Sequence, residues 1–384
     1  MTRPLHDAPA DVATLLARLA AALDGSGPAV AAGGAAGEGA QVPDEVAVVV
    51  ATSGSTGEPR SVLLDVAALR ASATATADRL SGPGQWLLAL PPTHVAGIQV
   101  LVRSALAGTV PVALDPGPFR PEAFVAAARR MHDGTRYASL VPTQLVRLLD
   151  DPTATAALTG LDAVLLGGAA APASLLEAAR GAGVPVVTTY GMSETCGGCV
   201  YDGVPLDGVE VTIEDGLIHL AGPVLARGYL GRADLDAQTF VVSDGVRRLR
   251  TRDLGRIEGG RLSVLGRADD VIVTGGVNVA PAAVEAAIAE LAGVAEVCVV
   301  GVPDAEWGQV VVAAVVGAVP QSPAPTLEQV RSHVRRRLDA AHAPRHLVLL
   351  DSLPQRGPGK HDRRTLAATL AARFPDPTDR RTST

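Results

Sequence analysis

The chain has 384 residues, of which 47% are hydrophobic and only 3% aromatic, and its formal net charge is −7. This length predicts two domains, and the acidic balance disfavours a nucleic-acid or anionic-membrane surface. The chain has three cysteines, no signal-peptide core and no membrane-spanning apolar run, which together predict a cytoplasmic protein without a disulfide framework.

Helical and extended patterns alternate over the first half of the chain. Apolar residues three and four apart predict a helix at 11–23, and the Gly- and Ala-rich stretch 24–43 predicts a flexible surface connection. Short apolar runs then predict strands at 45–51, 85–90, 109–114, 137–142, 163–168 and 184–191. Helical patterns lie between them at 120–131 and 143–151. This alternation predicts an α/β domain.

The pattern changes after residue 200. Short extended runs separated by Asp-Gly and Gly-Gly pairs predict hairpins and a small β subdomain. The tail predicts the helices and strands 280–291, 294–303, 309–317, 326–338 and 346–354. We therefore predict a large α/β N-terminal domain at 1–267, made of sheets with packed helices, and a small α+β C-terminal domain at 268–384.

Residues 51–64, ATSGSTGEPRSVLL, are rich in hydroxyl groups and follow a predicted buried strand. Backbone N–H groups and hydroxyls in such a turn can converge on phosphate oxygens, and Gly54 and Gly57 permit the backbone angles that this requires. The spacing of a Walker A loop is absent. Taken alone, the stretch is equally well interpreted as a phosphate loop or as a polar turn between two strands.

Two further stretches carry side chains that suit a nucleotide. TTYGMSETCGG (188–198) follows a predicted strand and holds Tyr190, a flat face for a base, and Glu194, a hard oxygen ligand for Mg²⁺. In RTRDLGRIEGG (250–260), the Asp253 carboxylate can accept hydrogen bonds from ribose hydroxyls. A solvated glutamate and a turn-capping aspartate are the structural alternatives.

The C-terminal part adds a charge cluster and a lysine. Arg267, Asp269 and Asp270 lie together at the predicted domain boundary, where a surface ion pair is the usual meaning of such a cluster. Lys360, in LPQRGPGK, is the only lysine of the chain. Since all other Lys or Arg positions of the chain hold arginine, a lysine at this position indicates that the geometry of an ammonium group is needed there. One such need is to stabilise charge in a transition state.

The identity and order of these five stretches resemble the core motifs of adenylate-forming enzymes, which include acyl-CoA synthetases, peptide-synthetase adenylation domains and luciferases. The resemblance covers residues 45 to about 370. It implies a mobile C-terminal domain that rotates about a hinge between two half-reactions. A carboxylate first attacks the α-phosphate of ATP·Mg²⁺, which gives acyl-AMP and pyrophosphate. A thiol, usually that of coenzyme A, then displaces AMP.

The resemblance also assigns roles to individual residues. The nucleotide-binding residues it implies are Thr52, Ser53, Gly54, Ser55, Thr56, Gly57 and Arg60 for the β- and γ-phosphates, Gly168, Ala169, Ala170, Tyr190 and Gly191 for adenine, Thr195 near the α-phosphate, and Asp253 and Arg267 for ribose. Glu194 resembles the Mg²⁺ ligand. Asp269 resembles the hinge residue, and Gly275 and Gly276 the turn that lines the pantetheine tunnel. Lys360 resembles the catalytic lysine that bridges the acyl carboxylate and the α-phosphate.

Two features differ from the usual family pattern. Arg60 stands where most members have lysine, which keeps the positive charge. The segment that precedes the phosphate loop is shorter than in most members, which predicts a shortened N-terminal subdomain. The family resemblance leaves a homodimer open.

The choice of acid depends on LPPTHVAGIQVLVRSALAG (90–108), which resembles the family's acyl-pocket segment. His94 can orient the carboxylate or gate the pocket, with a purely structural histidine as the alternative. Arg103 lies on an otherwise apolar helix, where a cation is costly unless paired, and a dicarboxylic acid would supply the partner. The alternative is that Arg103 faces solvent or pairs with an internal acid.

This pattern is similar to that of the o-succinylbenzoate–CoA ligases of menaquinone biosynthesis, in their actinobacterial form, where an arginine at this spacing faces the second carboxylate. The substrate-binding residues it implies are His94, Arg103, Gly191, Met192, Gly197 and Gly198. The alternatives are another aryl- or short-acyl-CoA ligase, an adenylation enzyme that loads a carrier protein, and a non-catalytic nucleotide- and acyl-binding protein. Cys196 and Cys199 have the spacing of a redox pair or half a zinc site, but no second pair exists, so we interpret them as small residues that line the acyl pocket.

Overall fold

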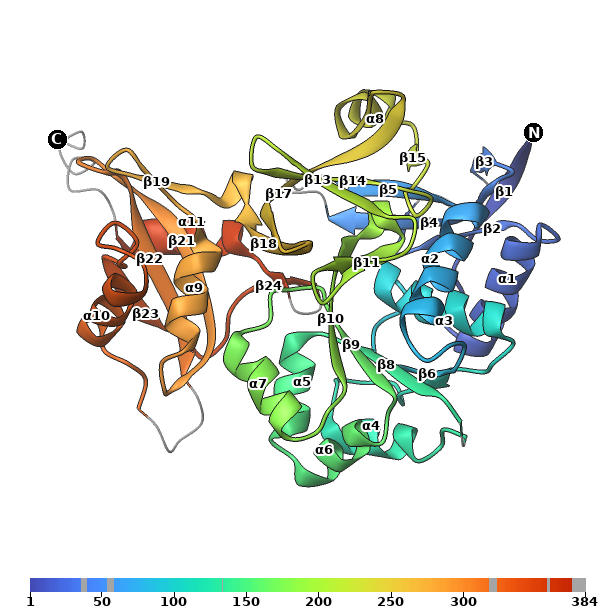
Figure 1. The fold of residues 1–384 in the computed structure, drawn as a ribbon, viewed down its shortest axis with the longest axis horizontal. Helices are drawn as coiled ribbons and strands as arrows, with labels where there is room; N and C mark the ends of the chain where they lie inside the picture. Colours follow the sequence, from blue (N-terminus) through green and yellow to red (C-terminus); the bar gives the residue numbers. More distant parts are fainter. Residues whose placement is uncertain (36–39, 54–58, 133, 318–322, 358–359, 375–384) are drawn as a thin grey trace. The chain divides into compact units, whose positions relative to one another are not determined.

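The computed structural model describes residues 1–35, 40–53, 59–132, 134–317, 323–357 and 360–374 (Figure 1). The chain divides into two compact units. The first unit comprises residues 1–169, 177–251 and 257–263, and the second comprises 170–176, 252–256 and the chain from 264 onward. The fold class predicted from the sequence, an α/β unit followed by an α+β unit, is confirmed. The exact domain limits, 1–267 and 268–384, stay a prediction.

The first unit begins with a six-stranded sheet in the order β15-β5-β4-β2-β1-β3. Its strands are β1 (Thr2–Asp7), β2 (Ala29–Ala32), β3 (Gln41–Pro43), β4 (Val46–Ser53), β5 (Pro59–Asp65) and β15 (Gly228–Tyr229). The prediction of a flexible connection over 24–43 is wrong at Ala29–Ala32, because β2 is fully buried and pairs in parallel with both β1 and β4. Residues 36–39 of this stretch lie outside the described residues. The small side chains of its AVAA run, flanked by Gly and Pro, carry no strand signal that distinguishes them from a loop.

A second sheet of the first unit has the order β12-β11-β10-β9-β8-β6-β7. Its strands are β6 (Gln85–Leu88), β7 (Val112–Ala113), β8 (Arg136–Leu140), β9 (Ala163–Leu166), β10 (Val186–Met192), β11 (Gly197–Tyr201) and β12 (Val204–Pro205). The strands from β7 to β10 run parallel, and β11 turns back antiparallel to β10. Because β9 and β10 are parallel, the loops that follow them lie at the same edge of the sheet, where α/β proteins bind ligands.

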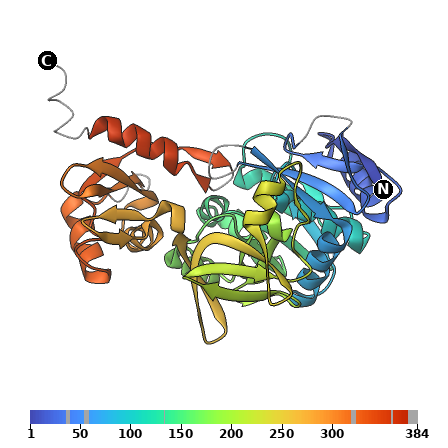
Figure 2. The ribbon, with the colours of Figure 1, turned by 90° about the horizontal axis from the view of Figure 1, so that it is seen from above.

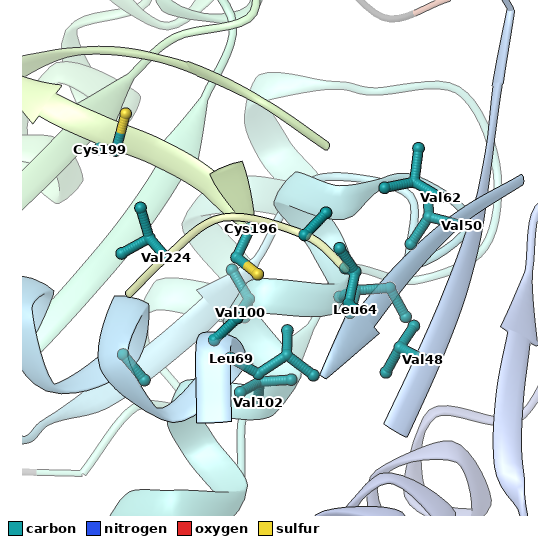
Figure 3. Packing of buried hydrophobic residues seen from close by; sticks show 14 of the residues in the cluster. Val48, Val50, Val62, Leu64, Leu69, Val100, Val102, Cys196, Cys199 and Val224 are labelled. Atoms are coloured by element: carbon teal, nitrogen blue, oxygen red, sulfur yellow. The ribbon is translucent and has the colours of Figure 1, made fainter. Parts of the chain in front are cut away.

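Helices α1 (Val12–Asp24), α2 (Val66–Arg79) and α3 (Val95–Ala107) pack in the core that joins these two sheets. Helices α4 (Pro121–Ala128), α5 (Pro142–Leu149), α6 (Pro152–Thr159) and α7 (Ala173–Gly181) accompany the parallel strands. The core is mainly aliphatic, as Figure 3 shows for the Val and Leu side chains that β4, β5, α2 and α3 contribute. Burial of this apolar surface is the main source of folding free energy for the unit.

A further sheet contains β13 (Glu210–Glu214), β14 (Leu217–Ala221), β16 (Phe240–Ser243), β17 (Val246–Glu258) and β18 (Arg261–Arg267), with α8 (Ala233–Thr239) before β16. The predicted hairpins are present. Asp215-Gly216 and Asp244-Gly245 connect paired strands with positive φ at both residues, the conformation that two-residue hairpin turns require.

The second unit has a sheet in the order β20-β19-β22-β21, with β23 paired to β22. Its elements are β19 (Ile272–Thr274), β20 (Val277–Val279), α9 (Pro281–Ala289), β21 (Val294–Asp304), β22 (Gly308–Gly317), α10 (Leu327–Arg337), β23 (His346–Leu349), β24 (Gln355–Gly357), β25 (Lys360–His361) and α11 (Arg363–Arg373). Alternate residues of β21 and β22 face α9 and α10 on one side of the sheet and α11 on the other. Figure 2 shows α11, in red, along one face of this sheet. Among the described residues of both units, none of the helices has the length and apolar character to cross a membrane.

Candidate nucleotide and acyl site

Strands β4 and β5 hold the two ends of the predicted phosphate loop. Thr52 and Arg60 are register partners in this antiparallel pair, and the Thr52 hydroxyl donates to the Arg60 carbonyl oxygen at 3.4 Å. Gly54, Ser55, Thr56 and Gly57 lie outside the described residues, and so does the side chain of Ser53. Their role as phosphate ligands therefore stays a prediction.

Arg60 is a half-buried cation beside this loop. Its guanidinium carbon lies 5.9 Å from the centroid of the Tyr229 ring, and its Nε is buried without a hydrogen-bond partner in the described part of the chain. The described residues also give it no carboxylate partner. A cation left in this state suits an anionic ligand such as a phosphate.

Glu194 lies in a short turn, η1 (Ser193–Thr195), between β10 and β11. Its Oε1 accepts a hydrogen bond from the Tyr229 hydroxyl at 2.8 Å, and its backbone oxygen accepts one from Ala226 N–H at 2.8 Å. Within the described residues this carboxylate has no ion pair. Glu194 thus keeps an uncompensated negative charge and a second oxygen, the donor type that Mg²⁺ prefers.

Thr195, predicted near the α-phosphate, has a structural role in the same turn. The side chain is fully buried, its hydroxyl donates to the Gly197 carbonyl oxygen at 2.7 Å, and it accepts from Met192 N–H at 2.9 Å. A contact with phosphate would compete with these bonds. Their effect is to fix the turn that carries Glu194.

The glycines around this turn permit a close approach of two strands. A Cβ atom on Gly191 would lie 2.1 Å from the Gly197 carbonyl oxygen, so β10 and β11 can meet here only without a side chain at Gly191. Gly197 has φ 93°, which also favours glycine. The predicted contact of Gly191, Met192, Gly197 and Gly198 with substrate stays a prediction, while the steric need for glycine is explained by the fold.

Tyr190 and the loop after β9 lie at the same edge of the parallel sheet. Leu166 and Thr188 are register partners, so residues 167–169 follow β9 at the edge toward which β10 continues to Tyr190. Gly168 has φ 83°, and Gly168 and Ala169 are exposed. Ala170 belongs to the second unit. An exposed loop beside a half-buried tyrosine is a suitable platform for adenine.

Helix α3 carries the residues predicted to select the acid. His94 is exposed and precedes its first turn, while Gly97 lets the helix approach Pro91, whose carbonyl oxygen would lie 2.3 Å from a Cβ. Gln99, which the sequence analysis missed, is 1% exposed. Its Nε2 donates to the Cys196 carbonyl oxygen at 2.5 Å, and its Oε1 is buried without a partner in the described chain.

Arg103 lies one turn after Gln99 and is only 8% exposed. Its guanidinium carbon lies 4.9 Å from the Trp86 ring centroid, and its Nη2 donates to the Tyr201 hydroxyl at 3.4 Å. Its Nε is buried without a hydrogen bond, and the described residues include no carboxylate partner for it. The low exposure of Arg103 disfavours an outward-facing arginine, and among the described residues no acid pairs with it.

Cys196 and Cys199 are core residues and not a reactive pair. Both are fully buried among aliphatic side chains (Figure 3). Burial raises the pKa of the Cys199 thiol to about 12 and that of Cys196 further, so neither forms a thiolate at neutral pH. No group of metal-ligating side chains occurs among the described residues. The interpretation of the two cysteines as small residues that line the acyl pocket stays a prediction, and the structure places both in the core.

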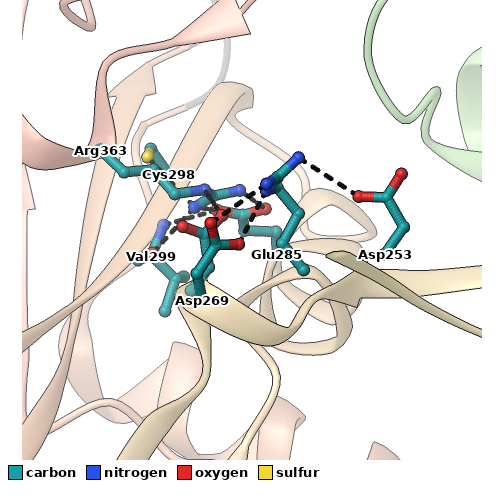
Figure 4. Close-up of polar contacts among 8 residues, drawn as sticks. Asp253, Asp269, Glu285, Cys298, Val299 and Arg363 are labelled. Atoms are coloured by element: carbon teal, nitrogen blue, oxygen red, sulfur yellow. Dashed lines mark hydrogen bonds and ion pairs between the residues drawn. The ribbon is translucent and has the colours of Figure 1, made fainter. Parts of the chain in front are cut away.

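In the second unit, Arg267 links Asp253 and Asp269, two of the predicted residues, which Figure 4 labels. Its Nη1 lies 3.4 Å from Asp253 Oδ1, and its Nε donates to Asp269 Oδ1 at 2.9 Å. Burial raises the pKa of Asp269, but the hydrogen bond and charge of Arg267 outweigh this effect and lower it overall. The structure thus brings both proposed ribose contacts together with the proposed hinge residue.

The remaining residues predicted in the second unit lie in turns. Gly275 and Gly276 have φ 56° and 79° between β19 and β20, and a Cβ on Gly275 would lie 2.6 Å from the Trp307 ring. Lys360 is exposed in β25 and has no ion pair within the described chain. The roles predicted for the glycine turn and for Lys360 stay predictions.

Arg363 forms a half-buried cluster that the sequence analysis missed (Figure 4). Its guanidinium bonds both Glu285 oxygens, one of them at 2.7 Å, and lies 3.3 Å from Asp270. These contacts of Arg363 connect the start of α11, just after Lys360, to α9 through Glu285 and to the segment beside Asp269 through Asp270. These partners lie far apart in sequence, so no local pattern predicts them.

Two family models match the chain. The AMP-binding enzyme model matches residues 13–230, and the AMP-binding enzyme C-terminal domain model matches 283–360. The chain is 49% identical to a probable 2-succinylbenzoate–CoA ligase of Mycobacterium tuberculosis over 96% of this chain and 98% of that protein. The chain therefore belongs to the family of AMP-binding enzymes.

Two solved structures of o-succinylbenzoate CoA synthetase (MenE) from Bacillus subtilis are similar to this one. The complex with the acyl-adenylate intermediate OSB-AMP has a TM-score of 0.71 and 31% identity, and the match covers 84% of this chain and 69% of that one. The complex with ATP and magnesium ion has a TM-score of 0.72 and 28% identity, over 91% of this chain and 82% of that one.

Proposed function

We propose that this chain is an AMP-forming acid–CoA ligase that converts o-succinylbenzoate to o-succinylbenzoyl-CoA in menaquinone biosynthesis. The observation that carries the choice of acid is Arg103, a buried cation whose described surroundings are an aromatic ring and a hydroxyl. Burying a charge in this way is costly unless a partner arrives. A substrate with a second carboxylate supplies that partner, whereas a fatty or simple aromatic acid does not.

The first half-reaction uses groups of both units. Arg60 and the residues from Thr52 to Gly57 bind the β- and γ-phosphates, and Glu194 holds Mg²⁺. The uncompensated Glu194 charge fits such an ion, which when bound neutralises phosphate charge and polarises the phosphoryl oxygens. Tyr190 and residues 168–170 bind adenine, the turn that Thr195 fixes lies near the α-phosphate, and Asp253 and Arg267 bind ribose.

Lys360 supplies the positive charge between the acyl carboxylate and the α-phosphate. Its exposure and its lack of an ion pair in the described chain leave the ammonium available for this role. Charge accumulates on these oxygens as the new bond forms, and a positioned cation stabilises that state more than the ground state. His94, at the start of α3, orients the carboxylate.

The second half-reaction transfers the acyl group to coenzyme A in the cytoplasm. Movement about Asp269 replaces Lys360 at the reaction centre with the turn at Gly275 and Gly276, which lines the pantetheine path. Support for this step comes from the positive φ angles of the turn and from the ion pairs at Asp269. A homodimer stays a prediction.

The test is an acid panel with the wild-type enzyme, ATP, Mg²⁺ and coenzyme A. Pyrophosphate release and thioester formation are measured with o-succinylbenzoate, benzoate and a medium-chain fatty acid. We expect turnover with o-succinylbenzoate at a kcat/KM far above that of either monocarboxylic acid. Preference for a monocarboxylic acid would overturn the assignment of substrate, and absence of turnover with any acid would overturn the assignment as a ligase.

A further inference from the structure

The segment 226–230 joins the two parts of the proposed Mg·ATP site within the first unit. On one side it contacts η1, through Ala226 N–H to the Glu194 backbone oxygen and through the Tyr229 hydroxyl to the Glu194 carboxylate, both at 2.8 Å. On its other side it pairs with β5, the strand that begins at the phosphate loop, where Leu230 N–H donates to the Ser61 carbonyl oxygen at 2.8 Å.

Tyr229 is held firmly in this segment. Its side chain is 4% exposed, its ring lies 5.9 Å from that of Phe240, and its N–H donates to Asp236 Oδ1 at 2.7 Å. A Cβ on the preceding Gly228 would lie 2.6 Å from the same Asp236 oxygen, so the approach requires glycine. The phenol therefore has little freedom to turn away from Glu194.

The phenol is also fixed as a hydrogen-bond donor. The Tyr229 hydroxyl lies 2.8 Å from Glu194 Oε1, and an ionised carboxylate only accepts hydrogen bonds, so the phenol is the donor of this pair. A donor of this kind occupies Oε1 of Glu194 and leaves the other carboxylate oxygen for a ligand.

Arg60 meets the same tyrosine from the side of the phosphate loop. Its guanidinium carbon lies over the ring, 5.9 Å from the centroid. One aromatic side chain therefore contacts both a carboxylate suited to a metal ion and a cation suited to a phosphate. Glu194 comes from the turn η1 between β10 and β11 and Arg60 comes from β5, and Tyr229 is the side chain that contacts both.

We propose that Tyr229 is a positioning residue that orients the Glu194 carboxylate for Mg²⁺ and aligns it with Arg60 on the triphosphate. This inference rests on the proposed ATP-dependent function. Residues that hydrogen-bond to a metal ligand reduce the cost of ordering it, and their removal typically lowers metal affinity or activity by roughly 10- to 100-fold. A purely structural tyrosine would leave the Mg²⁺ dependence unchanged.

The test compares Tyr229→Phe with the wild-type enzyme. ATP binding is measured by calorimetry without any acid, over a series of Mg²⁺ concentrations and with chelator, and pyrophosphate release is measured over the same series. We expect the Mg²⁺ concentration for half-maximal ATP binding and turnover to rise roughly tenfold. Binding of metal-free ATP and KM for the acid should stay within about twofold, since the ring beneath Arg60 remains.

Two controls separate this role from a loss of folding. Tyr137→Phe removes another buried hydroxyl, which bonds the Gly82 carbonyl oxygen at 2.9 Å, and should leave the Mg²⁺ dependence unchanged. In a Glu194→Gln background, Tyr229→Phe should have no further effect on the Mg²⁺ dependence, because the phenol acts through that carboxylate.

Each outcome decides one point. An unchanged Mg²⁺ dependence in Tyr229→Phe, or an equal shift in Tyr137→Phe, would overturn the positioning role. Failure of the wild-type enzyme to bind ATP would instead contradict the proposed function. Because this binding is measured without acid, an error in the choice of substrate leaves the test of Tyr229 intact.

Discussion

Replacing Arg103 with methionine removes the charge and keeps most of the apolar volume of the side chain. If the guanidinium binds the remote carboxylate, the variant loses a charge-assisted interaction worth ~1.5–3 kcal/mol. This corresponds to a roughly 10- to 150-fold fall in kcat/KM for o-succinylbenzoate. Since the remote carboxylate does not react, the contact is the same in ground and transition state, and the loss should appear mainly in KM.

The assay is pyrophosphate release with o-succinylbenzoate and with a monocarboxylic analogue of similar size. Arg103→Met should impair only the first acid, and Arg103→Lys should be intermediate because it keeps the charge without the planar fork. Arg147→Met, at an exposed position on α5, is the matched control and should behave as the wild-type enzyme. Equal losses with both acids would refute the reasoning.

The stability of the same variant gives an independent check. Arg103 is buried without a carboxylate partner in the described chain, so its charge costs folding free energy that the Trp86 contact offsets only in part. Chemical unfolding of Arg103→Met should therefore give a midpoint equal to or above that of the wild-type protein. A clear decrease would show that Arg103 serves packing and not substrate.

Three further predictions concern other parts of the chain. Lys360→Ala should lower acyl-AMP formation at least ~100-fold, yet convert supplied acyl-AMP to thioester at nearly the wild-type rate; parallel losses in both assays would contradict its role. The pKa of Asp269 is lowered in the folded state, so its contribution to stability is present above the unfolded pKa and is lost as pH falls through the folded value. Unfolding measured between pH 7 and pH 3 should accordingly show a smaller decrease for Asp269→Asn than for the wild-type protein, whereas identical curves would refute this coupling. Because burial raises the pKa of Cys196, Cys199 and Cys298, iodoacetamide at pH 8 should modify none of them before unfolding, and mass spectrometry of the native protein would reveal any exception.

Local patterns predicted the strands and helices that carry the site. The β-branched run at 45–51 becomes β4, and the apolar periodicity at 11–23 becomes α1. The strand β2 was missed because its AVAA run has neither bulk nor alternation, and only its partners β1 and β4 make it a central strand. Local sequence patterns do not encode pairing between distant segments, and this pairing is what makes residues 29–32 a strand.

At the site, too, residues in local motifs could be predicted and residues defined by distant contacts could not. Glu194 and Lys360 could be predicted as site residues because each stands in a recognisable motif. Tyr229 was missed because its proposed role depends on contacts with residues that are distant in sequence. These are Glu194, 35 positions away, and Arg60, which follows the phosphate loop. The surroundings of Arg103 likewise come from β6 and β11, and no pattern along α3 could indicate them.

The most direct test of the central claim is ATP–pyrophosphate exchange with two forms of one acid. The first is o-succinylbenzoate, and the second is the same molecule with its non-reacting carboxylate converted to a methyl ester. Our account predicts efficient exchange with the free acid and a kcat/KM roughly 10-fold or more lower with the ester. In Arg103→Met, the difference in kcat/KM between acid and ester should largely disappear. Equal exchange with acid and ester in the wild-type enzyme would contradict recognition of a second carboxylate by this chain.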